Sequence, residues 1–303
     1  MKAKYFCLAV ILSCLSGCAR DSSEKISRKV TQSSDETLSC GANSQKNLRT
    51  VGIVPQFPPA QIMEVYTPIF DKIGSITDLC FQIVMSKNIP EFEENLISET
   101  HDYAFMDPYH QVMVKDKYIP IIRDRSRLLT GIIVTHKQSD IKTIDDLSGR
   151  RMFLPAPNAF GASLLTKELL KRNKITPEII YVNTHPNVYR NVFFDHSSAG
   201  GGVNNTLIKE QDSLKSHLRV LSETEGFAAH PFSGSSRLSE TELTSVALAL
   251  KQLSKDPQYK ETLRKAQLSN PIDTNYQKDY QVLEKLHLEE FIDLNTKERE
   301  SKK

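Results

Sequence analysis

The chain has 303 residues, a formal net charge of +2 at neutral pH and no tryptophan. Its basic residues are spread along the sequence without a basic stripe or an interleaved aromatic platform, which argues against a nucleic-acid-binding protein. The part that follows a leader and a polar segment is long enough for about two domains of ordinary size.

The N-terminus predicts an export signal. Lys2 and Lys4 precede a run over Cys7–Leu15 that is apolar apart from one serine and is too short to span a bilayer as a mature helix. The run ends in Leu-Ser-Gly before Cys18, which resembles the lipobox of bacterial lipoproteins, and Ala19 favours the outer membrane where a cell has one. We therefore expect a signal peptide over residues 1–17 and a protein anchored by a lipid on Cys18, periplasmic or at the cell surface. A plain secretory signal is the alternative.

Residues 18–47 are rich in Ser, Lys, Asp and Glu and have few side chains able to build a core, so we predict a flexible tether. Outside the leader and Cys18, two cysteines remain, Cys40 and Cys80. In an oxidising compartment they can form a disulfide that joins the tether to the body. A buried free thiol at Cys80 is the other possibility.

Short apolar runs alternate with amphipathic segments along the body. The predicted elements before residue 129 are strands at Thr50–Val54, Leu79–Met85, Tyr103–Met106 and Ile119–Arg123, and helices at Ile62–Ile73, Pro90–Ile97 and from Pro108 onward. A second set has strands at Gly131–Thr135, Arg151–Leu154, Ile179–Asn183 and Leu218–Ser222, with helices at Ser163–Arg172 and Val188–Phe194. After Pro231 we expect helices alone, at Glu240–Leu253, Tyr259–Leu268 and Tyr276–Leu286. This order predicts an α/β chain in two lobes, with mainly parallel sheets and a helical C-terminal part.

Ligands in open α/β sheets bind beyond the carboxyl ends of the strands, where loops lead into helices. One such loop, Asn158–Ser163, places small residues at the expected start of a helix. A helix N-terminus leaves backbone N–H groups unpaired, so small residues there let an anion approach closely. The sequence therefore predicts an anion site formed by Asn158, Ala159, Phe160, Gly161, Ala162 and Ser163. The alternative is an ordinary helix cap at Asn158 that binds nothing.

Four stretches carry a resemblance to a known family: VGIVPQFPPAQIMEVYTPIFDKIG, DYAFMDPYHQVM, GIIVTHKQSDIKTIDDLSGRRMFLPAPNAFGASLLTKELL and AGGGVNNTL. In order and spacing they resemble the phosphate/phosphite/phosphonate-binding proteins of bacterial ABC importers, most strongly over Ser139–Arg151. The resemblance covers nearly the whole body. It implies a type II-like, two-lobed periplasmic-binding-protein fold that closes on a ligand and delivers it to a membrane permease. It also implies one lobe from residues 48–128 and 229–303 and another from residues 129–228.

The family usually has Ser-Thr-Ser-Gly where this chain has Asn158 to Gly161, so three hydroxyl donors to the ligand are missing. Each hydrogen bond to a charged group is worth roughly 1.5 to 3 kcal/mol, more than the roughly 0.3 to 2 kcal/mol from the helix field. A phosphonate would need replacement donors, for which Asn158, Ser163, Tyr109 and His185 are the candidates. Otherwise Phe160 has made the pocket more apolar and the ligand has changed. Ala199 stands where the family often has an aspartate, so recognition of a ligand amine is not expected.

The other candidates lie on the remaining loops. Gln56 and Phe57 are expected to line the floor of the site, and Tyr109 rather than His110 is expected to reach the ligand. His185 resembles a family histidine that contacts the ligand. Asp107 suits a helix cap. Asn204 suits either the site or a turn.

Catalytic motifs and metal-ligand spacing are absent from the sequence, and the eight histidines are scattered. We therefore expect no enzyme activity, cofactor or metal site. The predicted function is a solute-binding lipoprotein that takes a small anionic ligand and contacts an ABC permease. A ligand-sensing or interaction lipoprotein of the same fold, acting on a membrane signalling partner, is the alternative.

Overall fold

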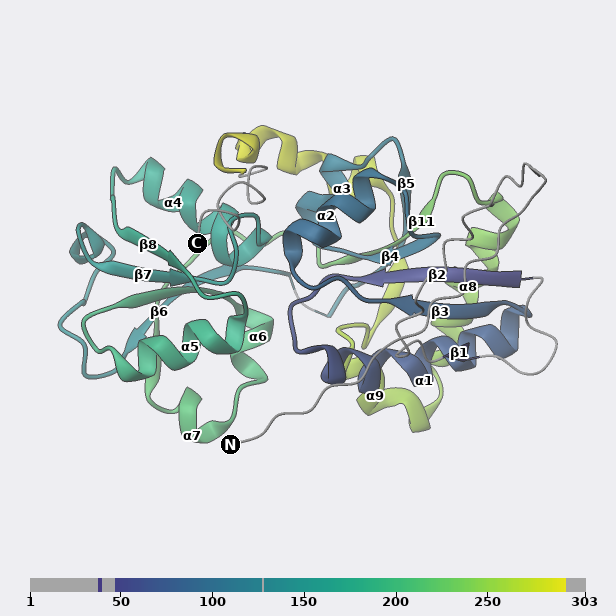
Figure 1. Cartoon of the computed structure of the whole chain (residues 1–303), viewed down its shortest axis with the longest axis horizontal. Helices are drawn as coiled ribbons and strands as arrows, with labels where there is room; N and C mark the ends of the chain where they lie inside the picture. The colour runs from purple at the N-terminus through teal and green to yellow at the C-terminus, as the bar shows by residue number, and fades with distance from the viewer. Residues whose placement is uncertain (1–37, 40–46, 127, 293–303) are drawn as a thin grey trace, which may run out of the picture. The chain divides into compact units, whose positions relative to one another are not determined.

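The computed structural model describes residues 38–39, 47–126 and 128–292, which form two β-sheets with helices on both faces of each (Figure 1). The signal peptide, Cys18 and nearly all of the expected tether, including Cys40, lie outside these residues. Cys80 is disulfide-bonded, so it is not the free thiol considered above. Within the described part of the chain, no helix is both long and apolar enough to pass through a membrane.

The first sheet has seven strands in the order β1-β3-β2-β4-β11-β5-β12. Their bounds are β1 Leu38–Ser39, β2 Leu48–Ile53, β3 Cys80–Val84, β4 Tyr103–Phe105, β5 Tyr118–Asp124, β11 Pro231–Ser235 and β12 Pro271–Asp273. Strand β2 pairs in parallel with β3 and β4, whereas β11 runs antiparallel between β4 and β5. The chain therefore returns to the first sheet after building the second one.

Helices cover the two faces of the first sheet. The helix α1 (Pro59–Thr77) lies on one face, and α2 (Ile89–Ile97) and α3 (Pro108–Met113) lie on the other (Figure 1). In α1 the buried side chains Ile62, Val65, Ile69 and Ile73 recur at helical spacing, which aligns them against the strands. The remaining helical segments of this half are α8 (Glu240–Leu253), η4 (Pro257–Tyr259) and α9 (Lys260–Lys265).

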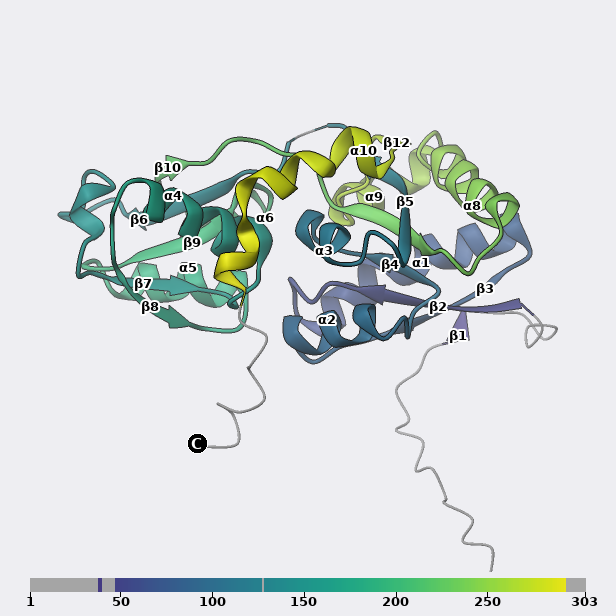
Figure 2. The same ribbon diagram turned by 90° about the horizontal axis from the view of Figure 1, so that it is seen from above.

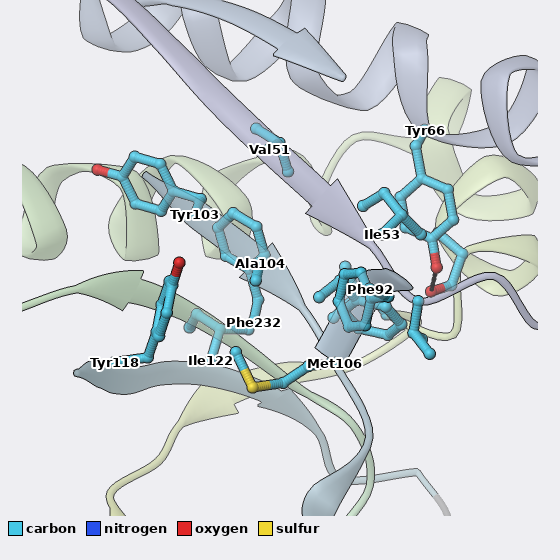
Figure 3. Close-up of a cluster of buried hydrophobic side chains, with 14 of the residues drawn as sticks. Val51, Ile53, Tyr66, Phe92, Tyr103, Ala104, Met106, Tyr118, Ile122 and Phe232 are labelled. Carbon is cyan, nitrogen blue, oxygen red and sulfur yellow. Dashed lines mark hydrogen bonds between the residues drawn. The ribbon is translucent and has the colours of Figure 1, made fainter. Parts of the chain in front are cut away.

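Aromatic side chains fill the core of the first sheet (Figure 3). Tyr103 of β4 stacks on Phe232 of β11, with ring centroids 5.5 Å apart and an interplanar angle of 6°. The phenol of Tyr66 donates to the carbonyl of Ala266 at 3.1 Å, so its polar end is satisfied inside the core. This packing joins α1, the sheet and the segment after α9 into one body.

His101 is a buried histidine of this core whose two ring nitrogens have no partner among the described residues. Burial lowers its pKa to about 4, although the nearby charge of Asp102 opposes the shift. The imidazole is therefore neutral in the fold and protonates more readily in the unfolded chain. Its contribution to stability is complete above the unfolded pKa of about 6.5 and is lost as the pH falls towards 4.

We expect the wild type to lose about 3 kcal/mol more unfolding free energy between pH 7 and pH 4 than His101→Phe, which cannot protonate. Urea unfolding followed by circular dichroism at several pH values measures the difference. Parallel pH curves for the two proteins would contradict the assignment.

The second sheet has five strands in the order β10-β6-β9-β7-β8. The bounds are β6 Gly131–His136, β7 Arg151–Leu154, β8 Glu178–Tyr181, β9 Ala199–Val203 and β10 Leu218–Glu223, with η2 (Asp145–Leu147), α6 (Asn204–Ile208) and α7 (Asp212–Lys215) in the connections. On one face lie η3 (Phe160–Leu165) and α4 (Thr166–Arg172), and on the other lies α5 (His185–Phe194) (Figure 1). The division into lobes at 128/129 and 228/229 remains a prediction.

Strand β9 is built from glycines because helices approach it closely from both faces. A Cβ on Gly201 would lie 2.2 Å from the carbonyl oxygen of Ala162 in η3. Cβ atoms on Gly200 and Gly202 would lie 2.5 Å from Val188 and 2.4 Å from the Tyr189 hydroxyl, both in α5. Since side chains alternate along a strand, the three glycines serve the two faces in turn. The backbone of η3 therefore rests directly on the sheet.

Three expectations about secondary structure were wrong. The sheets are mixed rather than mainly parallel, since β9, β10, β11 and β12 all take part in antiparallel pairs. The region after Pro231 is not helical alone, because it contains β11 and β12. The helix predicted from Ser163 starts at Phe160 as one π-helical stretch, η3, before α4 continues it.

The C-terminal segment links the two halves. After α10 (Tyr276–Asp279) it continues as η5 (Gln281–Leu286) and η6 (Leu288–Phe291), and Figure 2 shows it running from the first sheet to α4. Lys115 of the first half bonds Glu284 at 2.8 Å. Lys171 of α4 pairs with Glu290, and Lys167 donates to the carbonyl of Phe291. We call residues 281–291 the C-terminal strap.

Candidate ligand-binding site

The predicted anion-binding turn is buried in the described structure. Asn158 is 2% and Phe160 1% exposed, and every residue from 158 to 163 is buried. The Ser163 hydroxyl donates to the carbonyl of Ala156 at 2.5 Å, so it is engaged by the turn's own backbone. The amide of Phe160, at the start of η3, faces the first half of the chain and makes its bond there.

The carboxylate of Asp107 accepts that amide. Its Oδ2 lies 3.2 Å from the Phe160 nitrogen, while Oδ1 accepts from Gln56 Nε2 at 2.9 Å and from His230 Nε2 at 2.7 Å. Asp107 ends the loop after β4, and His230 directly precedes β11, so the sheet topology brings them together. A negative charge of the protein itself therefore occupies the position predicted for a ligand's oxyanion.

Several groups determine the charge of Asp107. Burial alone would raise its pKa, but the hydrogen bond and charge of His230, the charge of His110 and the Phe160 amide lower it well below its ordinary value. The carboxyl group is thus ionised throughout the physiological range. An ionised group in this environment is stable only because the donors surround it.

A second buried carboxylate, Glu93 of α2, bonds the other end of the turn. Its Oε2 accepts from the Asn158 side-chain amide at 2.8 Å, and its Oε1 accepts from His110 Nε2 at 3.2 Å. His110 Nδ1 in turn accepts from the Asp107 backbone N–H at 3.3 Å. These bonds connect Glu93, His110, Asp107 and Asn158 into one network. We call Gln56, Glu93, Asp107, His110, Asn158, His230 and the Phe160 amide the carboxylate cluster.

His185 lies beside this cluster at the first turn of α5, where the Thr184 hydroxyl caps the helix by accepting from the Asn187 amide at 3.3 Å. His185 is 3% exposed. Burial lowers the pKa of His185 to about 4. The charge of Asp107 opposes this shift, and the charge of His230 adds to it. Its Nδ1, like that of His230, has no partner among the described residues. The side chain is therefore a neutral imidazole with unused hydrogen-bonding capacity near the Asp107 carboxylate.

The other predicted site residues lie further out. The Phe57 ring centroid is 5.1 Å from the Lys209 ammonium. The Tyr109 hydroxyl approaches Glu289 of the C-terminal strap at 3.5 Å. The Asn204 side chain donates to the Leu128 carbonyl at 3.0 Å, beside the segments that join the sheets. His110, and not Tyr109, is in the carboxylate cluster.

Sequence reasoning missed Glu93 and His230. Glu93 is one of three glutamates in α2 and nothing in its spacing distinguishes it from a solvent-facing charge. His230 precedes a segment that was expected to be helical. The single signal available was the run Asp107-Pro-Tyr-His110 after a buried strand, where we assigned Asp107 only a capping role. In the described ranges, no three His, Cys, Asp or Glu side chains are placed to hold a metal ion.

The fold is that of a class of protein, the two-lobed periplasmic binding proteins of type II. Residues 51–280 match the family described as ABC transporter, phosphonate, periplasmic substrate-binding protein. The chain belongs to this family, whose members are substrate-binding transport proteins and not enzymes. The comparison with curated proteins gives no match.

Solved structures share the fold at low sequence identity. A binding protein component of an ABC phosphonate transporter from Pseudomonas aeruginosa is 12% identical, with 80% of this chain and 85% of that chain covered and a TM-score of 0.71. PhnD1 from Prochlorococcus marinus, in complex with methylphosphonate, is 15% identical over 79% of this chain and 97% of that chain, with a TM-score of 0.70. XAC2383 from Xanthomonas citri, bound to ATP, is 14% identical over 82% and 100%, with a TM-score of 0.68.

Proposed function

We propose that this protein is the lipid-anchored solute-binding component of an ABC importer and that it takes a small oxyanion of the phosphate or phosphonate type at the turn that opens η3. Membership of the family supports the importer role. The Leu-Ser-Gly-Cys sequence ending at Cys18 supports the anchor. The partner in the membrane is then an ABC permease that receives the ligand.

The observation that carries the ligand assignment is the bond between the Phe160 amide and Asp107 Oδ2. It supports the view that the start of η3 attracts negative charge without the serine and threonine hydroxyls, because a carboxylate takes that position. An oxyanion must displace Asp107 to bind there. His185, whose Nδ1 has no partner among the described residues, and the Asn158 amide, which Glu93 holds here, are the donors that we propose for the ligand.

The test is a titration of the chain from Ala19, which keeps β1 and both Cys40 and Cys80, with methylphosphonate, phosphite, phosphate and sulfate, followed by thermal denaturation. A ligand that binds only the folded protein at 100 times its Kd stabilises it by about 2.7 kcal/mol, so a rise in Tm is expected for at least one oxyanion. Uncharged metabolites of similar size are the control. A response to an uncharged compound and to none of the oxyanions would reject this ligand class.

One observation favours the second candidate, a sensing or interaction lipoprotein. Asp107 and Glu93 of the first half bond the Phe160 amide and the Asn158 side chain, so the protein's own groups join the two halves. A protein that closes in this way can present one fixed surface to a membrane signalling partner. The genes beside this one discriminate: a permease and ATPase support import, whereas a histidine kinase or cyclase supports sensing.

A further inference from the structure

A cavity of about 250 Å³ lies apart from the turn, between α6 and the end of α9. Both halves of the chain line it, so a molecule inside it touches segments on either side of the connections between the sheets. The polar residues of its lining are Asp124, Ser126, Asn205, Lys209, Arg264, Gln267 and Ser269.

The electrostatics of this cavity favour an anion. The Lys209 ammonium donates to the Lys265 carbonyl at 2.7 Å and lies over the Phe57 ring. The nearby charge that affects its pKa is the positive charge of Arg264. Burial, followed by the Arg264 charge, lowers the pKa of Lys209 to about 8. A partly buried cation that a second positive charge repels is stabilised by an anion beside it.

The one acidic residue of the lining, Asp124, is engaged by backbone donors. Asp124 Oδ1 accepts from the Ser126 amide at 2.5 Å, and Oδ2 accepts from the Asn270 amide at 3.1 Å. Arg264 pairs with Glu261 on the exposed side of α9, at 2.6 and 2.7 Å. Among the described residues Arg264 is ion-paired and Lys209 is not, so Lys209 is the cation with which an anion in the cavity would pair.

Gln267 connects the cavity to the carboxylate cluster. The φ angle of Gln267 is 62°, in the left-handed region. After a helix this conformation is usually adopted by glycine or asparagine, but here the residue is a glutamine. Its side-chain amide donates to Gln56 Oε1 at 3.1 Å, and Gln56 donates to Asp107. Gln267 Oε1 meets the Asn205 amide at 3.4 Å. The side chain thus lies between the cavity and the group that occupies the turn.

We propose that this cavity, the Lys209 pocket, is a binding site for a small oxyanion such as a carboxylate or a phosphate, held by Lys209 and Arg264 and by the amides of Asn205 and Gln267. The proposal adds a second anion position to the proposed function and rests on it for the assumption that the two halves bind a ligand between them. Binding in this pocket does not depend on hydroxyl donors at the turn, because the ammonium and guanidinium groups of the pocket donate charged hydrogen bonds to the anion.

The test titrates the chain from Ala19, which keeps β1 and both Cys40 and Cys80, with inorganic phosphate and with acetate. Isothermal titration gives the Kd, and NMR shifts of the side-chain amides of Asn205 and Gln267 and of the backbone amide of Phe160 report the location. Lys209→Gln is expected to weaken binding at least tenfold, and Lys209→Arg, which keeps the charge, is expected to restore most of it. The matched control is Lys260→Gln, which removes an exposed charge from α9 and is expected to bind like the wild type.

If Lys209→Gln and Lys260→Gln bind phosphate with equal affinity, the proposal that the Lys209 pocket binds an anion is overturned. If Asp107→Asn changes the affinity and Lys209→Gln does not, the anion binds at the turn alone, which overturns this proposal and leaves the proposed function intact. If Lys209→Gln abolishes binding while Asp107→Asn has no effect, the pocket is supported and the turn is rejected. A wild type that binds neither phosphate nor acetate overturns the Lys209 pocket, and the titration with methylphosphonate and phosphite then decides the proposed function separately.

Discussion

Replacing Asp107 with alanine is expected to raise the affinity of the protein for methylphosphonate by about 10- to 100-fold. The carboxylate competes with the ligand for the Phe160 amide and repels any second negative charge nearby. A hydrogen bond to a charged group is worth roughly 1.5 to 3 kcal/mol, which corresponds to that range of affinities. Asp107→Asn retains the shape of the side chain and removes the charge, so a smaller gain is expected. Isothermal titration with methylphosphonate and phosphate measures both.

The control for this experiment is Asp102→Asn. Asp102 is also a carboxylate of the first half and also accepts a backbone amide, that of Thr50 at 2.9 Å, but it contacts no residue of the turn. Its variant is expected to bind like the wild type. Weaker oxyanion binding by both Asp107 variants would mean that the carboxylate assists the ligand instead of occupying its place.

Replacing Gly201 with alanine is expected to destabilise the protein by about 3 kcal/mol, and valine is expected to prevent folding. A Cβ here meets a backbone carbonyl at 2.2 Å and Leu154 Cδ2 at 2.3 Å, and a backbone atom cannot rotate away as a flexible side chain can. Overpacking in cores costs about 1 to 3 kcal/mol and occasionally more. Urea unfolding monitored by circular dichroism measures the change.

Gly149→Ala separates this contact from the general cost of losing a glycine. Gly149 has a φ of 71°, and a Cβ there meets nothing within 4 Å. Its substitution therefore tests backbone conformation alone, with an expected loss of about 1 kcal/mol. A Gly201 variant no less stable than the Gly149 variant would show that η3 does not rest on β9 as described.

The strands and helices that have strong local patterns were predicted from the sequence. The order of the strands within each sheet was not predicted. Arg151–Leu154 and Glu240–Leu253 were predicted with the bounds that the structure has, because a short apolar run and a regular amphipathic pattern each determine one local structure. Strand β9 was missed because Ala-Gly-Gly-Gly has no strand propensity. Its conformation comes from packing between η3 and α5, which local sequence does not contain.

The site shows the same limit. The small residues of Asn158–Ser163 led correctly to a buried turn at the start of a helical segment. The partners of that turn come from α2, from the end of β4 and from the residue before β11, separated by up to 137 positions along the chain. Only the tertiary fold brings Glu93, Asp107 and His230 together, so the presence of internal carboxylates was not visible in the sequence.

The C-terminal strap gives the molecule a mechanical property that its two sheets alone lack. Lys115 holds the strap at Glu284 on one side, and Lys171 and Lys167 hold it at Glu290 and Phe291 on the other. The chain also crosses between the halves near Leu129 and Phe227, which form a β-bridge, so the strap is a further link between them. The proposed function requires the halves to separate to admit a solute, and one end of the strap must then detach first. Because salt screens surface ion pairs, ligand entry is expected to become faster as the ionic strength rises.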